Sequence, residues 1–113
     1  MAARLNYVEL RAGEIGTAKR FYAEALGLSF TDYGPSYAAA AEEGGVALGL
    51  QGDAKEAPSA PLAIFQADDL QATLANVERA GGTVTVPIFA FPGGRRFHFR
   101  DLAGNELAAW QPA

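Results

Sequence analysis

Side chains able to bind a ligand or transfer a proton gather near both ends of this chain. Tyr7 and Glu9 alternate on one face of a strand-like run near the N-terminus. Arg96 and His98 have the same spacing near the C-terminus, and Glu106 follows them. A histidine titrates near neutral pH, so His98 can hydrogen-bond a ligand or act as a general base. Arginine beside aromatic side chains suits planar or anionic ligands.

Strand alternation predicts which side chains share a cavity-lining face. Phe97, Phe99, Leu107 and Ala109 read as core, so their neighbours along each strand face the other way. A mostly apolar cleft with a few polar groups is typical of small-molecule pockets. The predicted ligand-binding residues are Tyr7, Glu9, Tyr37, Gln66, Arg96, His98, Glu106 and Trp110, with His98 and Glu9 as candidate catalytic residues.

Four of the candidates also have a purely structural interpretation. Glu9 can be a solvated strand carboxylate, and His98 can lie on an exposed strand face. Arg96 can serve only as an ion-pair partner of Glu9 or Glu106. Trp110 can be partial core or a dimer contact instead of a stacking platform.

The elements that position these residues follow a repeated order. Val8 and Leu10 alternate with the candidate residues in the first strand. Gly27 is a plausible helix stop, and Asp68 a plausible N-cap of the second helix. That helix buries a stripe of Leu70, Leu74, Val77 and Ala80. Strands are predicted over 6–10, 28–33, 36–41, 46–50, 62–67, 83–89, 95–100 and 106–110, and helices over 16–26 and from 70 to about 80, with 43–45 separating two strands and 101–105 forming a turn.

This order is β-α-β-β-β, a linker, and β-α-β-β-β, which predicts two related modules. Leu10 and Phe65 end corresponding strands, and Gly27 and Gly82 follow corresponding helices, both with an offset of 55 residues. A solenoid needs three or more copies. We therefore expect one domain over 1–113, with module one at 4–51, the linker at 52–61 and module two at 62–111.

Composition excludes several classes of protein. The chain has 113 residues, half of them hydrophobic, which predicts a globular domain with its own core. It has no cysteine, which excludes disulfides and a thiol nucleophile and fits a cytoplasmic location. The net charge of −4 argues against nucleic-acid binding. We also expect no signal peptide, because residues 1–4 lead straight into the first strand pattern, and no membrane span, because no apolar run approaches ~20 residues.

Four motifs in order resemble the vicinal oxygen chelate superfamily, also called the glyoxalase/bleomycin-resistance/dioxygenase family, and within it a glyoxalase-like branch. The motifs are Phe21-Tyr22 with Leu26-Gly27, Asp68-Asp69-Leu70, Gly81-Gly82, and Gly94 to Asp101 with Gly104-Asn105-Glu106-Leu107. The resemblance implies an α+β fold of two paired βαβββ modules, whose cupped mixed sheets carry the helices on their outer faces. It also implies a homodimer.

The same resemblance implies where a divalent metal is held in related enzymes. The corresponding positions here are Tyr7, Gly49, Leu62 and Ala108. A catalytic metal of this class needs three or four N or O ligands. We therefore predict no metal cofactor, with a rearranged site of Glu9, His98 and Glu106 as the alternative.

Two functions of different classes follow. The first is a metal-free protein that binds a small planar or anionic molecule, as the bleomycin-resistance members of the family do. The second is a glyoxalase-like lyase, isomerase or dioxygenase-type enzyme that uses His98 and Glu9 or a non-standard divalent metal site. A structural or regulatory partner domain is a third, less favoured interpretation.

Overall fold

A computed structural model of the chain describes residues 2–41 and 45–113. The chain divides into two compact units, which are described separately. The N-terminal unit is Tyr7–Leu62. The C-terminal unit joins the segment that ends at Asn6 to Ala63–Ala113. In the described residues, neither helix is long and apolar enough to cross a bilayer.

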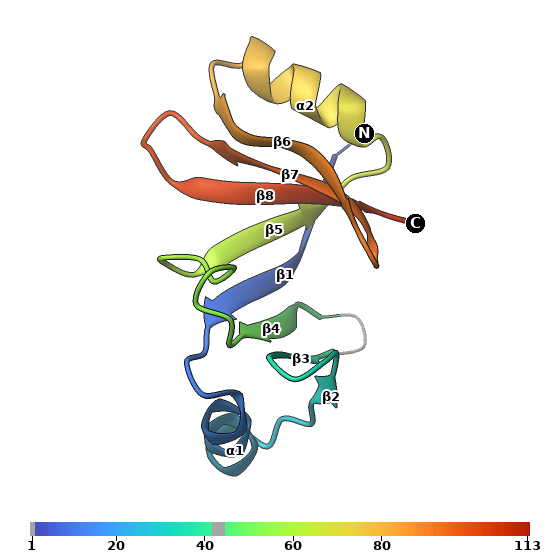
Figure 1. The fold of residues 1–113 in the computed structure, drawn as a ribbon. Coiled ribbons are helices and arrows are strands. Elements are labelled where there is room, and N and C mark those ends of the chain that lie inside the picture. The colour runs from blue at the N-terminus through green and yellow to red at the C-terminus, as the bar shows by residue number, and fades with distance from the viewer. Residues whose placement is uncertain (1, 42–44) are drawn as a thin grey trace. The chain divides into compact units, whose positions relative to one another are not determined.

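The N-terminal unit is a mixed four-stranded sheet with one helix. Strand β1 (Arg4–Arg11) enters it at Tyr7 and runs parallel to β4 (Ala47–Gln51). Strands β3 (Tyr37–Ala40) and β2 (Thr31–Asp32) continue the sheet in antiparallel pairs. Helix α1 (Ile15–Leu26) packs against β3 and β4 (Figure 1). Ala38 and Leu50 pair across β3 and β4 and are fully buried.

The C-terminal unit repeats this plan, and its last three strands are longer than their counterparts in the N-terminal unit. Strand β5 (Leu62–Gln66) runs parallel to β8 (Glu106–Pro112). Strands β7 (Gly94–Arg100) and β6 (Thr83–Phe91) follow in antiparallel pairs. Figure 1 shows helix α2 (Leu70–Arg79) lying over β6, and it contacts β7 and β8 as well.

The core of the C-terminal unit lies between α2 and the sheet. Leu70 and Phe97 are fully buried there, together with Ala67 and Ala109. The side chain of Gln111 ties β8 to the helix, since its Oε1 accepts from the backbone N–H of Leu70 at 2.8 Å. The predicted core positions Phe97 and Ala109 are therefore confirmed. The opposite face of β7 and β8 is left for Arg96, His98 and their neighbours.

Both helices begin and end at identifiable caps. The predicted stop at Gly27 is confirmed, because Gly27 has φ 72° and its N–H donates to the carbonyl of Ala23. The predicted N-cap at Asp68 is wrong. Asp69 is the cap, and its carboxylate accepts from the N–H of Ala72 at 3.1 Å. Ala80, expected on the buried stripe, is an exposed C-cap residue.

The second strand is much shorter than the predicted 28–33. The N–H of Leu28 donates to the carbonyl of Tyr22, which ties Leu28 to the helix end. The backbone N–H of Tyr33 donates to the carbonyl of Tyr37 and closes a turn before β3. The strand pairing with β3 is therefore limited to Thr31 and Asp32. The connection predicted at 43–45 falls mostly outside the described residues, and only Gly45 is described.

The expected fold class is confirmed. In the described residues, two helices and eight strands of one mixed sheet give an α+β protein in which the order β-α-β-β-β occurs twice along the chain. Within each unit, the helix lies on one face of that unit's strands and polar candidate residues lie on the other. The boundaries predicted for the modules and the linker stay predictions.

Candidate functional site

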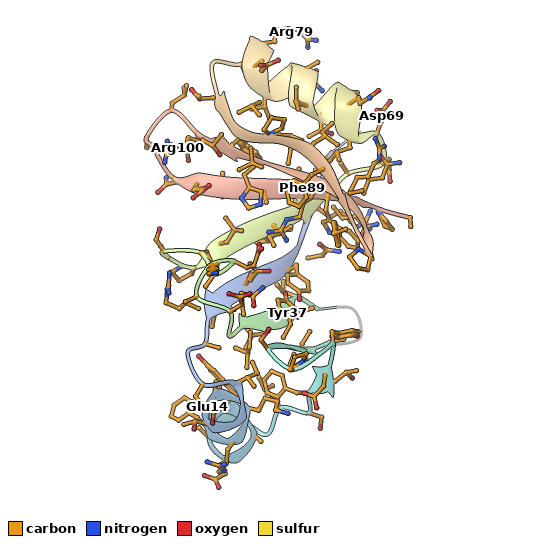
Figure 2. The ribbon with its side chains drawn as sticks, viewed as in Figure 1. Glu14, Tyr37, Asp69, Arg79, Phe89 and Arg100 are labelled. Carbon is orange, nitrogen blue, oxygen red and sulfur yellow. The ribbon has the colours of Figure 1, made fainter. Side chains whose placement is uncertain are left out.

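A chain of hydrogen bonds joins Tyr7, Tyr37 and Glu9 in the N-terminal unit. The hydroxyls of Tyr7 and Tyr37 are 2.5 Å apart, and the hydroxyl of Tyr37 donates to Glu9 Oε1 at 3.0 Å. Because Tyr37 donates its one proton to Glu9, it accepts the proton of Tyr7. Tyr37 is labelled in Figure 2. The chain of donors runs from Tyr7 through Tyr37 to the carboxylate.

Gly49 makes room for these hydroxyls. It lies on β4 directly opposite Glu9 on β1 and Ala39 on β3. A Cβ atom on Gly49 would overlap the hydroxyls of both Tyr7 and Tyr37. Close approach of other groups to a bare backbone is one of the uses of glycine in strands. The two phenols therefore occupy the space that a side chain at position 49 would take.

Burial keeps the hydroxyl of Tyr37 protonated in this cluster. Glu9 is 3% exposed and is the one buried charged side chain among the described residues. Burial, and then the nearby Glu9 carboxylate, raises the pKa of Tyr37. Tyr37 therefore stays protonated at neutral pH and can donate to Glu9. The alternative that Glu9 is a solvated strand carboxylate is wrong.

A second polar cluster lies on β6, β7 and β8 of the C-terminal unit. The Nε–H of Arg96 donates to His98 Nε2 at 3.2 Å. Glu106 Oε2 lies 3.7 Å from His98 Nδ1, which is beyond hydrogen-bond distance but close enough for charge attraction. The hydroxyl of Thr85 reaches the same oxygen at 3.4 Å. This face thus carries a cation, an imidazole and a carboxylate in a row.

His98 is held in its neutral form. Its side chain is 15% exposed. Burial, and then the positive charge of Arg96, lowers the pKa of His98, while Glu106 opposes the shift. An uncharged imidazole at neutral pH can accept a proton or a hydrogen bond. The alternative that His98 lies on an exposed strand face is wrong.

Aromatic rings surround the guanidinium of Arg96. Its Cζ lies 5.6 Å from the ring centre of Phe89 and 5.9 Å from that of Phe91. Both distances are within the range of a cation–π contact. Phe89, labelled in Figure 2, lies 6.0 Å from the ring of His98, and Phe91 lies 6.3 Å from Trp110. A planar anion bound here can contact both the positive charge of Arg96 and the aromatic rings around it.

Trp110 and Gln66 belong to an amide network with Asn6. The indole N–H of Trp110 donates to Asn6 Oδ1 at 3.2 Å, and Asn6 Nδ2 donates to Gln66 Oε1 at 2.7 Å. Gln66 and Trp110 face each other across β5 and β8. These bonds fix the orientation of the indole, which presents its ring beside Phe91.

The structure divides the predicted ligand-binding set between the two units. Tyr7, Glu9 and Tyr37 cluster in the N-terminal unit, and Arg96, His98, Glu106, Trp110 and Gln66 share a face of the C-terminal unit. The sequence interpretation missed Asn6, Thr85, Phe89 and Phe91. The alternation of Phe89 and Phe91 beyond the predicted strand end was the signal that could have found two of them.

The side chains at the family's metal positions do not fit a divalent metal. Tyr7 offers a phenol that is bonded to Tyr37, while Gly49, Leu62 and Ala108 offer no donor side chain. Throughout the described part of the chain, no group of three or more His, Cys, Asp or Glu side chains could hold a metal ion. Such a site needs three or four N or O ligands at short distances.

Comparisons with solved structures identify the fold. The chain is similar to a structure described as the NAD-dependent benzaldehyde dehydrogenase from Legionella pneumophila, with a TM-score of 0.78 and 16% identity over 96% of this chain and 99% of the other. It is similar to the methylmalonyl-CoA epimerase from Mycobacterium tuberculosis, with a TM-score of 0.76 and 16% identity over 97% and 88%. No curated protein matches the sequence.

A third similar structure is a Mn(II)-bound glyoxalase from Novosphingobium aromaticivorans. Its TM-score is 0.68 and its identity 23%, over 97% of this chain and 40% of the glyoxalase chain. The three proteins are named for different reactions. Their structural similarity to this chain therefore shows its fold but does not indicate an activity. The profile of the Glyoxalase/Bleomycin resistance protein/Dioxygenase superfamily matches residues 4–109. The chain therefore belongs to the glyoxalase/bleomycin resistance protein/dioxygenase superfamily.

Proposed function

We propose that this protein binds a small planar anion, such as an aromatic carboxylate, and does so without a metal. The observation that carries the proposal is the guanidinium of Arg96 lying over the rings of Phe89 and Phe91. Trp110 adds a third ring beside Phe91. Guanidinium groups pair with carboxylates through two parallel N–H bonds, and ring faces bind planar molecules.

The donor chemistry supports the metal-free part of the proposal. Two phenols fill the space beside Gly49, one of the four positions where related enzymes are expected to place a ligand. Burial and the Glu9 carboxylate raise the pKa of Tyr37, so Tyr37 serves as a neutral hydrogen-bond donor to Glu9. The charge that attracts the ligand would then come from Arg96.

The test is titration calorimetry of 2-naphthoate with protein dialysed against EDTA. Binding is expected for the wild type, and Arg96→Ala should weaken it about tenfold or more, since a charged hydrogen bond contributes about 1.5–3 kcal/mol. Arg95→Ala is the matched control, because Arg95 is exposed, lies next in the chain and points to the other strand face. Equal losses in both variants would contradict a site at Arg96.

A proton-transfer enzyme is the second candidate, and the relay of Tyr7, Tyr37 and Glu9 is what favours it. A buried carboxylate reached through two hydroxyls can accept a proton from a carbon acid. Methylmalonyl-CoA epimerases recur among the similar structures. Deuterium exchange at the α-carbon of methylmalonyl-CoA, followed by NMR, tests this activity. Exchange that is lost in Glu9→Gln would favour the enzyme over the binding protein.

A further inference from the structure

The bond between Arg96 and His98 defines which nitrogen of the imidazole carries the proton. Arginine is always charged and can only donate, so His98 Nε2 must be the acceptor at 3.2 Å. A neutral imidazole with an unprotonated Nε2 carries its proton on Nδ1. This assignment follows from donor chemistry at one contact.

The surroundings of Nδ1 support the same assignment. Glu106 Oε2 lies 3.7 Å from this nitrogen, so a negative charge faces the proton. A carboxylate on one side of an imidazole favours the tautomer whose N–H points toward it. Thr85 holds that carboxylate by a contact at 3.4 Å from its hydroxyl.

The same bond constrains how Arg96 can be used. The guanidinium has five N–H donors, and the bond to His98 takes the single one on Nε. The two terminal nitrogens carry the other four, enough to serve a ligand as well as acceptors of the protein. Contacts with Phe89 and Phe91 further restrict the position of the group.

We infer that His98 is a positioning residue for Arg96: its Nε2 holds the Nε–H, so that the terminal nitrogens of the guanidinium take a carboxylate of the ligand. This inference rests on the proposed function for the identity of the ligand. If His98 positions Arg96 in this way, it makes the protein bind planar carboxylates more tightly than neutral planar molecules. It also predicts an uncommon property, the Nδ1–H tautomer, that is measurable without any ligand.

The tautomer is measured by long-range ¹H–¹⁵N NMR of the protein at pH 8. His98 is the chain's one histidine, so its signals are unambiguous. The expected spectrum has a protonated Nδ1 and an unprotonated Nε2. A protonated Nε2 would overturn the inference whatever ligand the protein binds.

Two variants then test the positioning role by calorimetry with 2-naphthoate and its neutral analogue 2-naphthamide. His98→Gln keeps an acceptor for Arg96, while His98→Leu has none. We expect His98→Leu to weaken 2-naphthoate binding about tenfold with little change for 2-naphthamide, and His98→Gln to stay near the wild type. Equal losses for both probes in His98→Leu, or no loss, would overturn the inference alone. If the wild type binds neither probe at millimolar concentration, the proposed function and the inference both fall.

Discussion

At the scale of single residues, neighbours give Gly49 and His98 their significance. Gly49 is a bare position that two tyrosine hydroxyls fill from β1 and β3. His98 is a buried imidazole with Arg96 on one nitrogen and Glu106 near the other. Each residue is therefore sensitive to a small change in size or charge.

Gly49→Ala tests the packing of the two phenols. The added methyl would overlap the hydroxyls of Tyr7 and Tyr37, and overpacking a filled site costs about 1–3 kcal/mol. Urea unfolding should show this loss. Gly16→Ala is the comparison variant: the atoms nearest its new methyl are the Glu14 carboxylate oxygens at 3.3 Å, a milder approach, and it lies in a helix, where alanine is favoured by up to about 1 kcal/mol. An unchanged Gly49→Ala would show that the tyrosines can lie elsewhere.

His98 makes stability depend on pH in a defined direction. Its pKa lies below 6.5 in the folded protein, because of burial and Arg96, so the unfolded chain binds the proton more readily. The stabilisation is complete above pH 6.5 and is lost as the pH falls through the folded pKa. Glu106 and Arg96 are the charged groups that face this side chain.

The measurement compares the wild type with His98→Gln by urea unfolding between pH 5 and 7.5. Carboxylates common to both proteins cancel in the difference. The stability of the wild type relative to the variant should fall as the pH is lowered. A difference that stays constant over this range would mean that His98 titrates as it does in the unfolded chain.

At the scale of elements, helix ends are set by side chains that reach back to the backbone. Asp68 and Asp69 both precede α2, yet the carboxylate of Asp69 is the one that accepts from the N–H of Ala72. At α1, Phe21 and Leu26 recur at helical spacing, yet these side chains are 61% and 65% exposed. The spacing of hydrophobic residues predicts that a segment is helical more reliably than it predicts which helix face is buried.

The pair of aspartates gives a matched test. Asp69→Ala should destabilise the protein by about 1 kcal/mol through loss of the cap. Asp68→Ala removes the same charge from an exposed neighbour and should change stability by less than about 0.5 kcal/mol. Thermal unfolding of both variants measures the difference in their stability. A larger loss in Asp68→Ala than in Asp69→Ala would indicate that Asp68 is the cap.

At the scale of the whole molecule, the superfamily fold is retained while the metal positions hold other chemistry. The family profile spans residues 4–109, but Tyr7, Gly49, Leu62 and Ala108 supply no metal-binding set. Similarity of fold to a Mn(II)-bound glyoxalase therefore does not by itself give this chain a metal site.

Metal removal and addition test the metal-free proposal. A ligand that binds the folded protein at 100 times its Kd adds about 2.7 kcal/mol of stability. EDTA, Mn²⁺, Ni²⁺ and Zn²⁺ are each expected to leave the unfolding temperature unchanged. The manganese glyoxalase serves as the positive control. Stoichiometric metal in protein purified without added ions would contradict the proposal.

Residue types and their spacing were enough to predict most of the elements and the family. Period-2 alternation placed Phe97 and Ala109 in the core. In the first strand, it placed Tyr7 and Glu9 on the face opposite Val8 and Leu10. The stop at Gly27 followed from the freedom of glycine to take a positive φ. The strand faces and the helix stop depend on residues that are close in the sequence. A hydrophobic strand face must also be buried, whichever strand it pairs with. That is why they are readable before the chain folds.

Which side chains meet depends on how distant strands pair in the folded chain. Tyr37 and Glu9 are 28 residues apart, and Thr85 and Glu106 are 21 apart, so each contact depends on strand register. The rings of Phe89 and Phe91 reach Arg96 because β6 continues to Phe91 and pairs along β7. A shift of one residue reverses every side chain of a strand. Local periodicity cannot specify that register across a turn or between distant strands, and it is the register that creates the candidate site.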